Sequence, residues 1–213
     1  MPSQQASRLT VALHLRCRCG QVRGIARDVS PSTGFRFICY CKDCQAFARV
    51  LGRQDVLDLA GETDIFQMPP RRVHISFGSE AMRCLRLSEK VLRWYADCCR
   101  TPIATTAAVP RFPLVAVIHT FMDHERDGRS RDVALGPPLC RLFGHSAVGP
   151  LPPNAPSPPT VWVFARRTSM LLGWWLRGLG HPTPFFEDRT KAPITTPREL
   201  TESERATGYP VPS

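Results

Sequence analysis

The stretch of this sequence best suited to chemistry is CYCKDC, residues 39–44, which places Cys39, Cys41 and Cys44 within six positions. Thiols at this spacing could serve a disulfide framework, a reactive thiol pair or a metal site. C-x-C and C-x-x-C steps let sulfurs converge at about 2.3 Å from one tetrahedral zinc ion. Three thiolates leave that ion one ligand short, so another residue, a water molecule or a substrate would complete it.

The other cysteines indicate a second metal site. They are Cys17, Cys19, Cys84, Cys98, Cys99 and Cys140. Cys17 and Cys19 form another C-x-C step, which could join the Cys98–Cys99 pair in one closed structural site. Residues 39–44 would then form a separate site with an open position, which is the feature that separates catalytic from structural zinc. Isolated cysteines such as Cys84 and Cys140 are more typical of small buried hydrophobic residues.

The start of the chain and the odd count of nine cysteines favour a reducing, cytoplasmic setting. MPSQQASRLTVALHL contains no apolar block of the length that a secretory signal requires. In a reducing compartment, clustered cysteines indicate metal ligands or reactive groups rather than disulfides. A thioredoxin-like redox pair would need a βαβ context, which the sequence does not indicate. Metal binding is therefore the favoured interpretation of residues 39–44.

The net charge of +10 does not by itself indicate a nucleic-acid-binding protein. The basic residues are scattered from Arg8 to Arg205, without a run of five or a stripe interleaved with aromatic residues. A solvated basic surface is therefore expected, and nucleic acid is not an expected partner. No apolar run approaches the roughly 20 residues of a membrane span. Paired carboxylates, a glycine-rich phosphate loop and a Ser–His–Asp arrangement are not apparent. No spacing suggests a site for five of the histidines, namely His74, His119, His124, His145 and His181.

Hydrophobic patterns predict a mainly β fold of the α+β class. Strands are expected at residues 11–15, 71–77, 84–88, 91–95 and 113–119, and a short helix at 44–52 that ends at Gly52. We expect one domain over residues 11–120, followed by a charged loop and proline-rich linker over 121–160.

A C-terminal appendage is expected over residues 161–213, beginning with a helix that ends near Gly178 or Gly180. Its apolar side chains are expected to pack on the main domain or to form a homodimer contact. The alternative is a helix that lies on a membrane surface. The last thirty residues look polar and loosely held, with a helical signal at TPREL, residues 196–200.

Four segments occur in order along residues 11–120, namely CRCGQV, CYCKDC, LAGETDIFQ and YADCCRTPI. This series resembles the glutathione-dependent formaldehyde-activating enzyme family, which shares its zinc-binding domain with centromere protein V. The motifs of that family are C-x-C-G-x-[VA], C-x-C-x-x-C, L-x-G-x-x-x-[IL]-x-x-[FY] and F-C-x-x-C-G-T-P. The first two segments match well, the third approximately, and the fourth is degraded.

The resemblance implies a Mss4-like β fold of packed sheets built around zinc. It implies that Cys17, Cys19 and Cys99 belong to the structural site, and that zinc and glutathione meet at Cys39, Cys41 and Cys44. The reaction that names the family adds glutathione to formaldehyde, giving S-hydroxymethylglutathione, and is classed as carbon–sulfur lyase chemistry. A zinc ion with three thiolates and an open position suits this reaction, because it can lower the pKa of a bound thiol or polarise a carbonyl oxygen.

The fourth segment departs from the family pattern at both a ligand and a turn position. The first cysteine of the motif falls on Ala96 and its glycine on Arg100, while Cys98 stands beside Cys99. Neighbouring side chains in a strand point to opposite faces, so adjacent cysteines share a metal only through an unusual backbone. Three alternatives remain open: Cys98 replaces the lost ligand, the structural metal is weak or lost, or a distant residue fills in. The distant candidates are His14, Cys84 and Cys140.

Two hypotheses of function follow. The first is a zinc-dependent carbon–sulfur lyase that acts on an adduct of glutathione or a similar thiol with an aldehyde. Cys39, Cys41 and Cys44 would hold its metal, and Lys42 would either attract a glutathione carboxylate or remain a solvated turn residue. The second is a non-catalytic, zinc-stabilised binding module that recruits a protein or polyanion through its basic surface and C-terminal helix.

Overall fold

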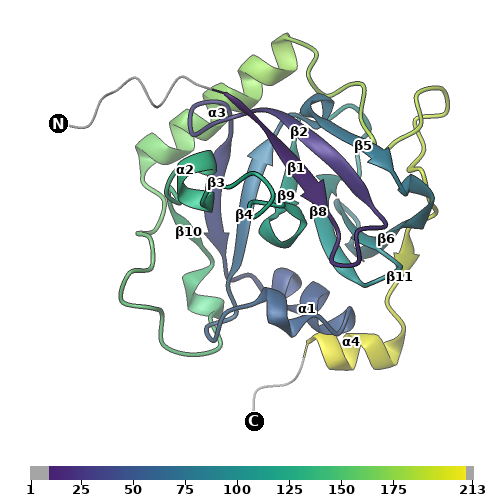
Figure 1. Ribbon diagram of the computed structural model, residues 1–213. Helices are drawn as coiled ribbons and strands as arrows, with labels where there is room; N and C mark the ends of the chain where they lie inside the picture. The colour runs from purple at the N-terminus through teal and green to yellow at the C-terminus, as the bar shows by residue number, and fades with distance from the viewer. Residues whose placement is uncertain (1–9, 210–213) are drawn as a thin grey trace.

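The computed structural model describes residues 10–209, which form two β-sheets with helices around them (Figure 1). The strands are β1 (Val11–Arg16), β2 (Arg23–Val29), β3 (Phe35–Cys39), β4 (Thr63–Met68), β5 (Val73–Phe77), β6 (Met82–Ser88), β7 (Val91–Ala96), β8 (Thr101–Ala107), β9 (Val115–Ile118), β10 (Arg141–Leu142) and β11 (Arg198–Glu199). The helices are α1 (Lys42–Val50), α2 (Arg131–Leu135), α3 (Val161–Leu176) and α4 (Glu202–Gly208). The predicted sheet-rich α+β class is confirmed.

The two sheets differ in size and pairing. A three-stranded antiparallel sheet has the order β1-β2-β5, and an eight-stranded mixed sheet has the order β10-β3-β4-β9-β8-β7-β6-β11. Only the edge strands β10 and β11 of the described residues pair in parallel, with β3 and β6. Each of these edge strands is two residues long and comes from the chain after residue 120. Such short edge strands leave little hydrogen-bonding edge free for another chain.

The main hydrophobic core lies between the two sheets. Leu13 and Leu15 of β1 pack there with Phe66 of β4 and Trp94 of β7. The opposite face of the large sheet carries two smaller clusters, one beneath α1 with Phe47 and one that includes Val163 of α3. The cysteine groups divide between these cores, because Cys17 joins the main core whereas Cys39 and Cys44 join the cluster with Val163.

The segment after α3 is held more firmly than its polar composition suggested. Phe185 and Phe186 are buried, and their ring centroids lie 5.2 and 6.3 Å from that of Trp94. The prediction of a loosely held tail is therefore wrong for the described residues, because two aromatic side chains outweigh many polar neighbours in the energy of burial. Residues 1–9 and 210–213, which include most of the stretch checked for a secretory signal and the chain end, lie outside the described residues.

The last helix begins later than the sequence predicted, since the helical signal was expected at residues 196–200. Residues 198–199 form β11, and α4 begins only at Glu202. The reason is a capping box, in which the Thr201 hydroxyl accepts from the Glu204 backbone N–H and the Glu204 carboxylate accepts from the Thr201 N–H. α4 lies beside α1 (Figure 1), where Tyr209 donates to Asp43 at 2.8 Å.

The stretch predicted as a loop and linker, residues 121–160, contributes two elements to the domain. α2 lies over the β3–β4 edge, and β10 pairs with β3. Neither element shows a hydrophobic period, since α2 has five residues and β10 two. Their positions come from long-range pairing, which local patterns do not encode. Along residues 10–209, none of the helices is long and apolar enough to cross a membrane.

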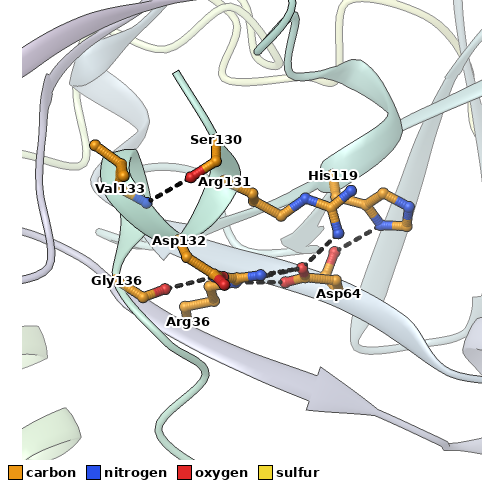
Figure 2. Close-up of polar contacts among 8 residues, drawn as sticks. All are labelled: Arg36, Asp64, His119, Ser130, Arg131, Asp132, Val133 and Gly136. Carbon is orange, nitrogen blue, oxygen red and sulfur yellow. Dashed lines mark hydrogen bonds and ion pairs between the residues drawn. The ribbon is translucent and has the colours of Figure 1, made fainter.

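A buried ion network joins α2 to the large sheet (Figure 2). Asp64 of β4 is almost completely buried and accepts from Arg36 of β3 at 2.7 Å and from Arg131 of α2 at 2.8 Å. The backbone carbonyl of Asp64 also accepts from the ring of His119 at 3.2 Å. Arg36 donates further to Asp132 and to the carbonyl of Gly136, both at 2.5 Å. One carboxylate thus connects three separate parts of the chain.

We predict that Asp64→Asn lowers the free energy of unfolding by about 3 kcal/mol, because it leaves a buried guanidinium without its counter-ion. Burial opposes ionisation of Asp64, but the contacts with Arg36 prevail and hold its pKa below the usual range. The stabilisation should be complete above the unfolded pKa of about 4 and lost as the pH falls through the folded pKa. Denaturant titrations at several pH values measure both effects. The exposed partner provides the control, since Asp132→Asn should cost less than about 1 kcal/mol.

Candidate metal centres

The first cysteine group forms where β3 ends and α1 begins. Cys39 is the last residue of β3, and Cys41 is the N-cap residue of α1. The Sγ atom of Cys41 accepts a hydrogen bond from the Cys44 backbone N–H at 3.4 Å. The C-x-x-C step, Cys41 to Cys44, therefore spans the N-terminus of the helix, and the C-x-C step connects Cys41 to Cys39 at the end of the strand. The partial positive charge of a helix N-terminus favours thiolates at this position.

The three sulfurs of this group converge. The Sγ atoms of Cys39 and Cys44 lie 3.7 Å apart, and all three Sγ atoms lie within 4.8 Å of one another. Sulfurs bound to one tetrahedral zinc at about 2.3 Å would lie about 3.8 Å apart. Cys39 and Cys44 are buried while Cys41 is partly exposed, so the accessible side of the group is at Cys41.

A buried arginine of the large sheet faces this group from beneath α1. Arg93 of β7 is 5% exposed, and its guanidinium donates to the Cys44 Sγ at 3.6 Å. It lies 3.8 Å from the Asp43 carboxylate and 5.7 Å from the centre of the Phe47 ring. The contacts of Cys44 with Cys39 and Cys41 hold the pKa of the Cys44 thiol well below its usual range, and the charge of Arg93 acts in the same direction.

The second group unites two hairpin turns. Cys17 and Cys19 lie in the turn between β1 and β2, and Cys98 and Cys99 lie in the turn between β7 and β8. The Sγ–Sγ distances are 3.6 Å for Cys17–Cys19, 3.3 Å for Cys19–Cys98 and 3.8 Å for Cys17–Cys98. The Cys99 Sγ lies 3.8 Å from that of Cys98, and all four sulfurs lie within 4.8 Å of one another. Four thiols at these separations can close a tetrahedral site.

The backbone explains how adjacent cysteines reach the same site. Arg100 has a φ of +56°, in the left-handed region that glycine adopts readily, so the chain turns sharply directly after Cys99. Residues 97–100 form a turn rather than a strand, and the rule of opposite faces does not apply there. Ala96, at the motif position of the missing cysteine, is buried in the main core. Cys98 thus lies where a fourth ligand is needed.

Hydrogen bonds reach two of these sulfurs, although burial still raises the pKa of the Cys17 thiol. The backbone N–H of Val22 donates to the Cys17 Sγ at 3.2 Å, and the Cys99 Sγ lies 3.1 Å from the Thr101 hydroxyl. Burial opposes ionisation of Cys99, but hydrogen bonds from Thr101 and Cys19 prevail and lower its pKa to about 6. A thiolate is the form that binds a metal ion.

The remaining candidates lie elsewhere. Cys84 is buried in the main core, and Cys140 is buried in the cluster with Val163 but outside both sulfur groups. The ring of His14 pairs with Asp127 at 2.5 Å. Lys42 is exposed at the start of α1 and makes no side-chain hydrogen bond or ion pair within residues 10–209. Its suggested role towards glutathione stays a prediction.

Sequence reasoning missed Arg93. The signal was present, since VLRWY places an arginine inside an otherwise apolar strand pattern. A charged residue in such a position is almost never buried without a partner. The partner could not be identified, because Cys44 is 49 positions away and reaches Arg93 only when α1 packs on the sheet.

The chain is therefore a sheet-rich α+β protein with two cysteine clusters, each able to hold a metal ion and compatible with zinc. A protein-family model, described as a family of unknown function (DUF6151), matches residues 9–194. The chain belongs to this family. A comparison with curated proteins found no match.

We predict about two metal ions per chain, one for each cysteine cluster. Cys98→Ala and Cys41→Ala should each reduce the content to about one, because a tetrahedral thiolate site rarely tolerates the loss of a ligand. Elemental analysis of protein purified without added metal measures the content. Cys84→Ala and Cys140→Ala, which remove buried thiols outside both clusters, provide the controls and should leave it unchanged. Equal losses in all four variants would contradict the assignment.

Proposed function

We propose that this protein is a zinc-dependent carbon–sulfur lyase of the glutathione-dependent formaldehyde-activating type, with an Mss4-like fold. Its open site would be the cluster of Cys39, Cys41 and Cys44, and its substrate an adduct of glutathione or a similar thiol with an aldehyde. Cys17, Cys19, Cys98 and Cys99 would hold a second, structural zinc. The observation that carries the proposal is the convergence of three sulfurs, rather than four, on one point beside a buried cation.

The donor set of the open cluster fits zinc. Three thiolates around a divalent ion carry a net charge of −1, and the buried guanidinium of Arg93 supplies the compensating positive charge. Such compensation matters because an unpaired charge is costly to bury. The division of sites also fits, since three protein ligands leave an open position and four close a structural site.

The chain's own residues would bind and orient the substrate. A bound zinc ion supplies Lewis acidity, which favours the thiolate form of a thiol substrate. The thiolate sulfur then forms a bond to the aldehyde carbon, the carbonyl electron pair moves to oxygen, and the proton released from the thiol ends on that oxygen. The reverse reaction releases the aldehyde. Cys41 marks the accessible side, and exposed Lys42 beside it could attract a substrate carboxylate.

The test is a titration of the cobalt-substituted protein with glutathione. Thiolate–cobalt absorption should change on titration, because the thiol of glutathione fills the open position of the three-cysteine site. Cys41→Ala should abolish the change, whereas Cys98→Ala, at the other cluster, should leave it intact. Formation of the S-hydroxymethyl adduct, followed by NMR, should exceed the uncatalysed rate only when the three-cysteine site is intact.

Two results would contradict the proposal. A wild-type spectrum that does not respond to glutathione would exclude an open thiol-binding position. A response that survives in Cys41→Ala but disappears in Cys98→Ala would assign the chemistry to the other cluster.

The outward face of α3 favours a second candidate function, binding to a membrane surface through this helix. Val163 and Trp174 point towards the domain, yet six large apolar side chains of this helix are more than half exposed, namely Val161, Trp162, Phe164, Leu172, Trp175 and Leu176. Residues 161–186 contain three arginines and no acidic residue. Exposed tryptophans beside arginines, without acidic groups, suit an anionic lipid surface.

We predict that the protein binds vesicles containing anionic lipid, and that Trp162→Ser with Trp175→Ser weakens binding at least about tenfold, because two apolar anchors are lost. Flotation with anionic and with purely zwitterionic vesicles measures this. Leu59→Ser with Phe77→Ser, which changes exposed apolar residues outside α3, is the matched control. Equal vesicle binding by all three proteins would refute the lipid assignment. So would the absence of lipid binding together with a concentration-dependent dimer that the α3 substitutions disrupt.

A further inference from the structure

A cavity of about 310 Å³, with Cys17 in its wall, opens beside the four-cysteine cluster. Its wall combines three arginines, Arg16, Arg18 and Arg131, with His119 and His124, and it also includes the acidic residues Asp123 and Glu125. A cavity of this size is at the small end of the range for ligand sites. The two histidines lie five positions apart and outside the sequence motifs, and the fold brings them beside Arg16 and Arg18.

His119 presents a fixed hydrogen-bond acceptor to this cavity. Its Nδ1 lies 3.2 Å from the backbone carbonyl oxygen of Asp64, which can only accept, so Nδ1 carries the hydrogen. Nε2 then holds a lone pair, and it makes no hydrogen bond to any residue in 10–209. Burial, assisted by the charge of Arg131, lowers the pKa of His119 to about 4, so the ring stays neutral near pH 7.

Arg131 presents a positive charge to the same cavity. One terminal nitrogen of its guanidinium donates to Asp64, but the side chain remains 38% exposed. The Asp64 carboxylate is shared with buried Arg36, so a single buried negative charge serves two arginines. Arg16 and Arg18 add positive charge to the wall, and Arg16 lies 3.9 Å from Asp123. With three arginines against the two carboxylates of Asp123 and Glu125, the wall carries a net positive charge and favours an anion.

Two residues of the wall, His124 and Arg131, contain buried polar atoms that form no hydrogen bond within the described residues. These buried atoms are both ring nitrogens of half-buried His124 and Nε of Arg131. Buried polar atoms without partners are costly and uncommon, and each calls for an explanation such as a bound ion or water. Three of the seven such atoms in the described residues belong to residues of this wall, an observation independent of the charge argument.

The acceptor and the cation are held close together. His119 bonds the carbonyl of Asp64 and Arg131 bonds its carboxylate, so both are anchored to one residue, and Figure 2 shows their side chains side by side. A ligand that satisfies both must carry an anionic group and a hydrogen-bond donor on neighbouring atoms. A carboxylate with a hydroxyl on the adjacent carbon has this arrangement.

We propose that this cavity is a binding site for a small 2-hydroxycarboxylate. The carboxylate pairs with the free edge of Arg131, supported by Arg18, and the hydroxyl donates to Nε2 of His119. The site is separate from the three-cysteine cluster and does not depend on the proposed lyase activity. It would give the protein a second ligand beside its structural metal cluster.

The experiment compares glycolate with acetate, which differ only by the hydroxyl, using calorimetry and the ring-proton NMR signals of the metal-loaded protein. Glycolate should bind at least about tenfold more tightly than acetate, because only its hydroxyl satisfies Nε2 of His119. His119→Phe should abolish this preference. Arg131→Gln should weaken glycolate binding at least about tenfold, since it removes a charge-assisted contact. Exposed Arg129→Gln, two positions away and outside the cavity wall, is the matched control.

Arg131→Gln also breaks a contact with Asp64 and could therefore destabilise the fold. Arg18 is exposed, so Arg18→Gln serves as a second variant. It should weaken glycolate binding several-fold without destabilising the fold. Thermal midpoints and metal content show which variants remain folded. The proposal is overturned by equal affinity for acetate and glycolate, by unsaturable weak binding of glycolate, or by unchanged affinity in both folded arginine variants.

Discussion

The buried carboxylate of Asp64 is the interaction on which the rest of the structure depends. The carboxylate lies within the β3–β4 pair, where it fixes Arg36, and it anchors α2 through Arg131. The backbone carbonyl of the same residue holds the segment after β9 through His119. β3 leads directly into Cys39, and the anchored segments form the wall of the cavity beside Cys17. A charge this deeply buried is tolerated only with its partners in place, so it selects one arrangement of these elements.

The two cysteine clusters use the same fold in different ways. The four-cysteine cluster joins two hairpin turns at the margin of the main core, and it links parts of the chain about eighty positions apart. A metal there would act as a cross-link in a domain whose sheets meet through apolar side chains. The three-cysteine cluster lies at a strand-to-helix junction, with a buried guanidinium behind it and one partly exposed thiol in front. That asymmetry fits the proposed division between an open site and a closed structural site.

The chain after residue 120 is integral to the domain in the described structure. It supplies both short edge strands of the large sheet, the aromatic pair that packs on Trp94, and the helix that lies beside α1. The exception is the outward face of α3, whose large apolar side chains are exposed rather than packed on the domain. The same C-terminal region therefore both completes the fold and carries its most unusual surface.

The sequence by itself determined the elements whose signals are local. The strands near residues 11–15, 91–95 and 113–119, the helix ended by Gly52, and the long C-terminal helix follow from period and capping, and the cysteine spacing fixed which thiols could cluster. It left open whether Cys98 could join Cys99, because that depended on the left-handed turn at Arg100. Arg93 beside Cys44, the histidines of the cavity and the two-residue edge strands were decided only by tertiary structure. Each depends on residues distant in sequence meeting across the sheet, and neither spacing nor hydrophobic period records such a contact.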